Sequence, residues 1–394
     1  MLGIRKYKYS NLKHMIVEST EAQIKHGSPN IANAVLGAVP VHKFPYKWTL
    51  KDAVFTKDKG KVFSCFACGG GSSFGYKLAG FDVIGHNDID KKMIEVYKAN
   101  HNPKYSFLES ITTFAKRRDL PQELYELDIL DGSPPCSSFS MAGNREKDWG
   151  KEKIFREGQE LQVLDTLFFD FIDLAKELQP KVVVAENVKG LLLGDAKQYV
   201  IKIYKEFEKA GYYCQHFLLD ASKMGVPQKR ERVFFIALRK DLAKPFLHFA
   251  DMFTEVPKIE LNFNEPEIKF SEFADYSGPP ITEYAKRAWD VRSEKDNNIA
   301  DSKKRVPGMK VSDMNTAYVF DDKVCQTLTA KGNCGSLLFS KPIRLSKQEF
   351  CNIGTFPQDY NFTCNFGYLI GMSVPPIMTA QISTQIYLQW LSKL

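Results

Sequence analysis

Residues 61–73, KVFSCFACGGGSS, decide the fold of this chain. The apolar run at 62–67 predicts a strand, and Gly69, Gly70 and Gly71 predict a tight turn that opens a helix. Glycines let a backbone approach a ligand closely, and a helix N-terminus offers free N–H groups. By itself this element indicates either a site for a nucleoside-containing cofactor, NAD included, or merely a tight turn.

The sequence on either side repeats this alternation of strand and helix. Asp88 ends the second predicted strand, where an acid can accept hydrogen bonds from a ribose diol. Such alternation predicts an α/β fold with a doubly wound, mostly parallel sheet, in which ligands bind beyond the carboxyl ends of the strands. The further predicted strands are 81–86, 127–130, 181–185 and 232–238, and the first clear helical spacing is at 91–101.

Outside 61–240 the pattern changes. Residues 241–342 carry prolines, isolated aromatics and a charged stretch at 292–305, and predict a smaller, irregular domain in which the charged stretch is a solvated loop. Residues 343–394 return to helical spacing, with an apolar stripe that predicts core packing. Residues 1–60 form an N-terminal extension whose role we do not predict. The stripe consists of Val374, Met378, Ile382, Ile386 and Trp390.

Composition narrows the class of protein. Hydrophobic residues make up 44% of the chain and charged residues 26%, a globular balance that excludes disordered and fibrous classes. The net charge of +7 is compatible with a polyanionic partner but does not identify one. The first residues lack the apolar core of a signal peptide, and no run of about 18 apolar residues predicts a membrane span. With eight scattered cysteines, we expect reduced thiols and a cytoplasmic location.

A proline pair precedes a cysteine in the stretch DGSPPCSS, residues 131–138. The stretch follows the strand at 127–130 and therefore falls on the ligand edge of the sheet. Pro134 and Pro135 fix the backbone and place the next side chain rigidly. That side chain is Cys136, a nucleophile whose reactivity depends on its thiolate fraction. An isolated motif of this kind can equally be a buried cysteine behind a turn.

Two further polar elements flank predicted strands. Glu186 and Asn187 follow the strand at 181–185, where a carboxylate is suited to serve as an acid or as a structural residue at a strand end. Gln228, Arg230 and Arg232 lead into the strand at 232–238, and strand alternation places them on one face. Guanidinium groups there could hold a carboxylate, a carbonyl oxygen or a phosphate, or form a solvated basic edge.

These elements occur in order at consecutive strand ends, and in this the chain resembles the C5-cytosine-specific DNA methyltransferases of bacteria and phages, the restriction-modification type. The resemblance implies a Rossmann-like, S-adenosylmethionine-dependent catalytic domain at 61–240 and a target-recognition domain at 241–342. Residues 343–394 would return to the catalytic domain. The motifs, found between residues 61 and 378, are FACGGGSS, NDID, DGSPPCSSFS, AENVKG, GVPQKRERVFF, RLSKQEFCNIGTFP and GMSVPP.

The resemblance also implies a mechanism on a cytosine flipped out of duplex DNA. Cys136 would add to carbon 6 of the ring, which makes carbon 5 nucleophilic enough to take the methyl group. Glu186 would protonate ring N3. Arg232 would hold O2 and orient Glu186, with Arg230 beside it. Residues 137–160 would form a loop that closes over the base.

The resemblance assigns binding residues without a metal. A zinc site at Cys65 and Cys68 is poorly supported, because no second cysteine pair follows at finger-like spacing. The implied contacts to S-adenosylmethionine are Phe66, placed against the adenine, Gly69, Gly71, Asp88 at the ribose, Ile89, Pro135 and Ser373. The implied contacts to the nucleic acid are Pro134, Asn187, Gln228 and Thr327.

Three positions depart from the family pattern. Cys68 stands where the glycine turn has its first glycine, Ser110 stands where an aspartate commonly contacts the adenine, and Met372 replaces the usual asparagine before Ser373. All three concern cofactor affinity and leave the nucleophile unaffected.

Two alternative functions share these motifs. One is a transfer-RNA cytosine-5 methyltransferase, and the other is a catalytically silent DNA-binding relative. Retention of Cys136, Glu186, Arg230 and Arg232 argues against the silent relative. The implied partner is double-stranded DNA, with the chain as a monomer and a cognate restriction endonuclease, acting separately, as an open option.

Overall fold

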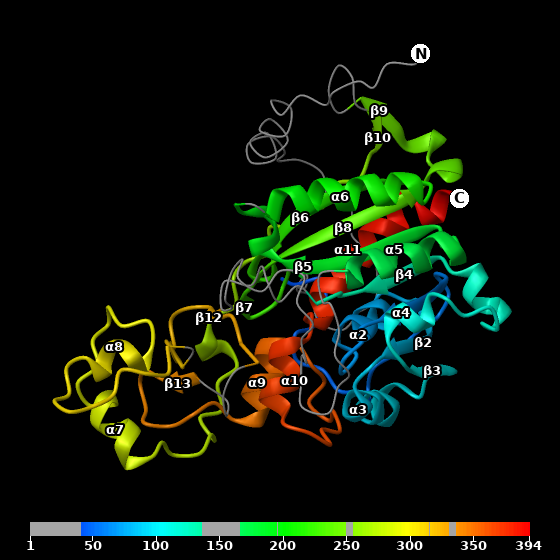
Figure 1. Cartoon of the computed structure of the whole chain (residues 1–394). Coiled ribbons are helices and arrows are strands. Elements are labelled where there is room, and N and C mark those ends of the chain that lie inside the picture. The colour runs from blue at the N-terminus through cyan, green and yellow to red at the C-terminus, as the bar shows by residue number, and fades with distance from the viewer. Residues whose placement is uncertain (1–40, 136–165, 195, 250–254, 315, 331–335) are drawn as a thin grey trace. The chain divides into compact units, whose positions relative to one another are not determined.

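A central sheet organises the chain (Figure 1). The computed structural model describes residues 41–135, 166–194, 196–249, 255–314, 316–330 and 336–394, so Cys136 and the predicted loop at 137–160 lie outside the described residues. Within the described part, seven strands form the sheet in the order β3-β2-β1-β4-β5-β8-β6. Their bounds are β1 (Lys61–Cys65), β2 (Asp82–Asp88), β3 (Tyr105–Leu108), β4 (Ile129–Gly132), β5 (Val182–Val188), β6 (Tyr212–Asp220) and β8 (Glu231–Arg239).

The sheet is mostly parallel, which confirms the predicted α/β class. Strand β8 alone runs antiparallel to both of its neighbours, β5 and β6. From β1 the chain winds outward through β2 to β3, then returns to place β4 on the other side of β1. This reversal creates a switch point at the carboxyl ends of β1 and β4, which is where doubly wound sheets bind ligands.

Helices cover both faces of the sheet because successive strand residues point to opposite sides. Phe63 and Val183 face a core under α4, α5 and α6, whereas their neighbours Val62 and Val182 face a core under α2 and α11 (Figure 1). The bounds of the helices are α2 (Gly71–Leu78), α3 (Lys91–His101), α4 (Ile111–Phe114), α5 (Leu167–Leu178), α6 (Ala196–Lys209) and α11 (Pro376–Gln389).

Helices α2 and α11 pack with almost no space between them. A Cβ atom placed on Gly75 of α2 would lie 2.4 Å from the carbonyl oxygen of Pro376, the first residue of α11. All five residues of the predicted apolar stripe are buried in the core beneath these helices, as expected. None of the helices in the described part of the chain combines the length and apolarity needed to span a bilayer.

Residues 41–60 pack against the C-terminal helices α9 (Lys347–Gly354) and α10 (Phe366–Met372) in a third core. Trp48 is buried there, and its indole N–H donates to the Thr355 carbonyl over 2.9 Å. The whole of Val41–Leu394 forms one compact unit.

A separate small core lies between residues 281 and 339. It is enclosed by α7 (Glu283–Trp289), α8 (Ile299–Lys303), β11 (Ala317–Val319) and β13 (Ser336–Leu338). By contrast, β9 (Leu247–Phe249) pairs with β10 (Glu255–Pro257), and Ile259 and Leu261 just after them pack into the main core. The small core is therefore built only from the later part of the region between 241 and 342.

The charged stretch at 292–305 is part of this small structure. Arg292 stacks on Trp289, with the guanidinium carbon 3.2 Å from the ring centroid. Asp296 is 4% exposed and pairs with Arg305, and the buried Lys303 pairs with Asp313. The prediction of a solvated loop is wrong for Asp296 and Lys303, which are buried, while the side chains of their partners Arg305 and Asp313 are 42% and 57% exposed.

Candidate functional site

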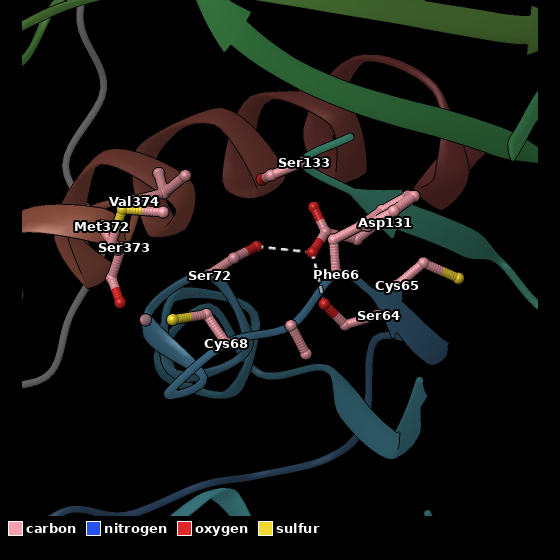
Figure 2. A pocket seen from close by; sticks show the side chains of 12 residues that line it. Ser64, Cys65, Phe66, Cys68, Ser72, Asp131, Ser133, Met372, Ser373 and Val374 are labelled. Atoms are coloured by element: carbon pink, nitrogen blue, oxygen red, sulfur yellow. Dashed lines mark hydrogen bonds between the residues drawn. The ribbon is translucent and has the colours of Figure 1, made fainter. Parts of the chain in front are cut away.

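A pocket opens at the switch point (Figure 2). It is lined by the end of β1 and the turn after it, by the end of β4, and by the residues that follow α10. Of the residues predicted to contact a cofactor, Phe66, Gly71 and Ser373 line this pocket directly. Among the described residues, no group of three histidine, cysteine or acidic side chains is placed to hold a metal ion.

The glycine turn keeps a left-handed backbone at the position where cysteine replaces glycine. Cys68 has φ 48°, a conformation that glycine adopts freely and that costs other residues about 1–2 kcal/mol. Phe66 also has a positive φ, 53°. The Cys68 N–H donates to the Asp88 carboxylate over 2.8 Å, which ties the turn to the end of β2. Cys68 therefore keeps the left-handed backbone that the turn requires, but its own backbone is strained.

Two glycines of the turn allow close approach of the C-terminal segment. A Cβ atom on Gly71 would lie 2.4 Å from the Val374 carbonyl oxygen and 3.0 Å from Cβ of Ser373. A Cβ atom on Gly69 would collide with Leu369 at 2.6 Å. The structure thus brings Gly69, Gly71 and Ser373 together, although more than 300 residues separate them. The Ser373 hydroxyl itself donates to the Leu369 carbonyl over 2.8 Å.

Asp88, Ile89 and Ser110 lie at the ends of the neighbouring strands β2 and β3. The carboxylate of Asp88 accepts a second bond from the N–H of Asp90 over 2.9 Å, and Ile89 between them is half-buried. Ser110 caps α4 by accepting from the Thr113 N–H over 3.1 Å. The serine at this departure from the family pattern therefore has a local structural role.

A second cluster forms where β5 meets β8. Glu186 and Arg232 form an ion pair with 3.0 Å between Oε1 and Nε, and they are 13% and 17% exposed. Arg232 lies opposite Val188 in the ladder, so Glu186 is its diagonal neighbour on the same face. The sequence placed Glu186 just after a strand, but β5 continues to Val188 because β8 pairs with its whole length.

Asn187 connects this cluster to the proline turn. Its side-chain amide donates to the Pro134 carbonyl over 3.2 Å, and its oxygen accepts from the N–H of Val188. Asn187 and Pro134 are both buried, and Pro135 is half-buried. The last described residues before Cys136 are therefore bound to β5 at Asn187, the residue that follows Glu186.

Gln228 and Arg230 lie just before β8, the strand that contains Arg232. The strand is interrupted at Arg230, which separates β7 (Gln228–Lys229) from β8. Gln228 accepts from the Leu328 N–H over 3.0 Å, and Arg230 donates to the carbonyls of Leu328 and Gly371, each over 3.2 Å. The interruption frees both side chains to turn inward and satisfy the main chain of a distant segment.

The same segment contains Thr327, whose hydroxyl donates to the Lys229 carbonyl over 2.6 Å. Here β12 (Cys325–Gln326) pairs in parallel with β7. Gln228 and Arg230 are 1% and 2% exposed. Burial lowers the pKa of Arg230 well below its ordinary value, the charge of Arg232 lowers it further, and Glu186 opposes both. Gln228, Arg230 and Thr327 thus interlock two segments that are about a hundred residues apart.

Asp131 is a site residue that the sequence analysis missed. It is 4% exposed, and its carboxylate accepts from the hydroxyls of Ser72 over 2.6 Å, Ser64 over 2.7 Å and Tyr76 over 3.1 Å (Figure 2). Burial raises its pKa to about 6 and the charge of Glu186 raises it too, whereas the three hydroxyls lower it. The signal that could have found it is a charged residue inside an otherwise apolar buried strand.

Comparison with known proteins identifies the family. The family described as C-5 cytosine-specific DNA methylase matches residues 60–388. The type II methyltransferase M.FnuDI of Fusobacterium nucleatum is 39% identical over 183 residues, which is 46% of this chain and 48% of that protein. M.NgoFVII of Neisseria gonorrhoeae is 26% identical over 365 residues, covering 84% of this chain and 87% of that protein.

The match to M.FnuDI spans about half the length of that relative, and the same holds for M.NgoPII of Neisseria gonorrhoeae, at 50%. At the level of fold, the crystal structure of a DNMT2 variant from Spodoptera frugiperda is similar with a TM-score of 0.56 and 20% identity, covering 83% of this chain and 99% of that one. With its ordered motifs, its switch-point pocket and a match across residues 60–388, the chain belongs to the C-5 cytosine-specific DNA methylase family.

Proposed function

We propose that this chain is a DNA (cytosine-5-)-methyltransferase that moves a methyl group from S-adenosylmethionine to carbon 5 of a cytosine flipped out of duplex DNA. The observation that carries the proposal is the pair of Glu186 and Arg232, held next to the proline turn by the bond from Asn187 to Pro134. An acid, a cation that orients it and the segment leading into Cys136 therefore converge at one edge of the sheet.

We propose that S-adenosylmethionine binds at the switch-point pocket, and the polar groups in and beside the pocket support this. The N-terminus of α2 offers N–H groups, and Asp88, bound to the glycine turn, offers carboxylate oxygens. When bound, the cofactor supplies an electrophilic methyl group. We propose that Phe66 lies against its adenine and that Asp88 binds its ribose. We assign the other contacts to Gly69, Ile89, Pro135 and Ser373.

The proposed chemistry uses three side chains. The thiolate of Cys136 forms a bond to carbon 6 while Glu186 gives a proton to ring N3, so that carbon 5 gains the electron density to attack the methyl group. Arg232 holds Glu186 in place and binds the exocyclic oxygen O2 of the cytosine. Loss of the carbon-5 proton to solvent water then restores the double bond and expels the thiolate of Cys136, and N3 returns its proton to Glu186, which leaves 5-methylcytosine.

We propose that Gln228, Arg230 and Thr327 act by positioning. Because Gln228 and Arg230 bind the main chain at Leu328 and Gly371, they fix the segment around Thr327 next to the catalytic strands. Pro134 and Asn187 would then form the wall behind the flipped base. In this proposal the buried guanidinium group of Arg230 takes no direct part in the reaction.

The reaction and its sequence specificity can be tested together. The purified chain is incubated with S-adenosylmethionine and unmethylated genomic DNA, and the DNA is then sequenced after bisulfite treatment. We expect protected cytosines within one short recurring sequence. Complete conversion of cytosines, in a sample whose cofactor binding is demonstrated by calorimetry, would contradict the proposal and direct the same assay to transfer RNA.

We further propose that residues 241–342 recognise the target sequence, with base-edge contacts for specificity and Lys and Arg contacts to phosphates for register. Exchanging residues 281–339, which carry their own core, for the equivalent segment of a relative is expected to transfer the relative's sequence preference. Bisulfite sequencing reads the result. The control is an exchange of residues 255–270, which pack on the main core and should leave the preference unchanged. An original preference retained by a folded 281–339 chimera would contradict this role.

We also propose that the enzyme is a cytoplasmic monomer and that a cognate endonuclease acts separately from it. A palindromic site can be methylated one strand at a time, so the reaction itself does not require a dimer. Light scattering of the purified chain with and without DNA tests the monomer.

A further inference from the structure

Asp131 is a buried carboxylate whose only partners in the described parts of the chain are uncharged. Ser64, Ser72 and Tyr76 donate to it, and no lysine, arginine or histidine of those parts forms an ion pair with it. A buried charge without a counter-charge is costly, and proteins retain one mainly where a partner arrives. Asp131 lines the switch-point pocket, so a ligand in that pocket can be the partner.

The hydroxyls around Asp131 are arranged to serve such a ligand. Each hydroxyl has one hydrogen, and in each case that hydrogen points to Asp131, which leaves the oxygen lone pairs free to accept. Ser72 and Ser64 both line the pocket and approach Asp131 from two sides (Figure 2). The floor of the pocket therefore offers acceptors and a negative charge, which suits a cationic donor.

The position of Ser72 indicates which part of the cofactor meets this floor. Ser72 is in the first turn of α2, whose N-terminal N–H groups suit a carboxylate. In an α-amino acid the ammonium group is attached next to the carboxylate. A methionine moiety with its carboxylate on α2 thus brings its ammonium group to Ser72 and Asp131.

We propose that Asp131 and Ser72 bind the α-ammonium group of the cofactor's methionine moiety, and that Ser64 and Tyr76 hold Asp131 in its ionised form. This inference rests on the proposed function, because it requires S-adenosylmethionine in the switch-point pocket. It assigns to the end of β4 a specificity for ligands that carry an amino-acid group.

The charges around Asp131 give the proposal a pH dependence. The titratable groups that face it are Cys65 on β1, Tyr76 on α2, Tyr97 on α3 and Glu186 on β5, and none of them supplies a positive charge. With a pKa of about 6, Asp131 is ionised at pH 8 and protonated at pH 5. Cofactor affinity is therefore expected to be constant near pH 8 and to weaken about tenfold by pH 5 as protons compete.

The test is titration calorimetry of the full chain at pH 5 to 8 with S-adenosylmethionine, with S-adenosylhomocysteine, which keeps the amino-acid group but has no sulfonium charge and should follow S-adenosylmethionine, and with 5′-methylthioadenosine, which lacks both. For Asp131→Asn, we expect affinity for S-adenosylmethionine at pH 8 to fall about ten- to hundredfold, as for a lost charged hydrogen bond, and the pH dependence to disappear. Affinity for 5′-methylthioadenosine should stay within about twofold of the wild type. Equal weakening of both ligands, or of neither, would overturn the proposal.

Tyr76→Phe is the matched variant, because it removes one donor to Asp131 at a residue that does not line the pocket. Losing a donor destabilises the ionised carboxyl, so the pH at which affinity falls should move upward while affinity at pH 8 changes little. An unmoved midpoint would overturn the assignment of Asp131 even where Asp131→Asn does not fold. Wild-type protein that binds no S-adenosylmethionine at any pH would instead refute the proposed function.

Discussion

Methyl transfer is expected to fall by about 10⁴- to 10⁶-fold in Cys136→Ser, the scale seen when a covalent nucleophile is removed. A serine hydroxyl at neutral pH is almost entirely protonated and is a much weaker nucleophile than a thiolate, so addition to carbon 6 fails. The described lining of the proposed cofactor pocket comes from β1 and its turn, from β4 and from the residues after α10, so we expect Kd for S-adenosylmethionine to change less than about twofold. Radioactive methyl transfer and calorimetry measure the two quantities separately.

Cys364→Ser is the control for this substitution. Cys364 is half-buried in the segment before α10 and belongs to neither cluster of the site, so its replacement should leave both quantities unchanged. Full activity in Cys136→Ser would exclude the covalent mechanism. A loss of cofactor binding equal to the loss of activity would instead place Cys136 in the cofactor site.

The second large effect is expected for Glu186→Gln, which should reduce kcat by about 10²- to 10⁴-fold, the usual contribution of a general acid. Glutamine keeps the size of the side chain and an oxygen for the N–H of Arg232, but it has no acidic proton to give to ring N3. Single-turnover methyl transfer measures the chemical step, and the KM for DNA should change less than kcat.

Glu231→Gln makes the same chemical change one residue away from Arg232. Glu231 pairs with Lys189 over 2.8 Å and is 42% exposed, and such exposed pairs contribute little. Its kcat should remain within about twofold of the wild type. Equal losses in the two variants would show that the charge of the region matters rather than a proton held by Glu186.

The sequence predicted most of the sheet, because strands buried on both faces are continuously apolar. It missed β3 and β6, which pair with one neighbour each at the two edges of the sheet. Tyr212–Asp220 mixes polar and apolar residues since an edge strand is only partly buried. No local pattern encodes the order in which strands pair, which is why the sequence predicted ligand binding at the strand ends but did not locate the switch point at β1 and β4.

The candidate site was predicted where motifs follow strand ends and was missed where contacts are long-range. Glu186 and Arg232 meet as expected, because antiparallel neighbours share a face. The break in the strand at Arg230 was not predicted, since the alternation argument assumed an unbroken strand, and the partners of Gln228 and Arg230 at Leu328 and Gly371 lie far away in sequence. Asp131 was missed in the sequence because its three hydrogen-bond donors lie on β1 and α2. In the motif that contains Asp131, Cys136 was considered instead.

The close packing of α2 on α11 determines when the chain can complete its fold during synthesis. Helix α2 leaves the ribosome early, but the surface that Gly75 requires is provided by residues 376–389. At about 5–20 residues per second, roughly 15–60 s separate the two events, and through that interval one face of the nascent sheet has no cover. The pocket beside α2 is thus completed only after residues 241–342 have been translated, so under the proposed function the nascent chain cannot methylate DNA before its proposed recognition segment exists.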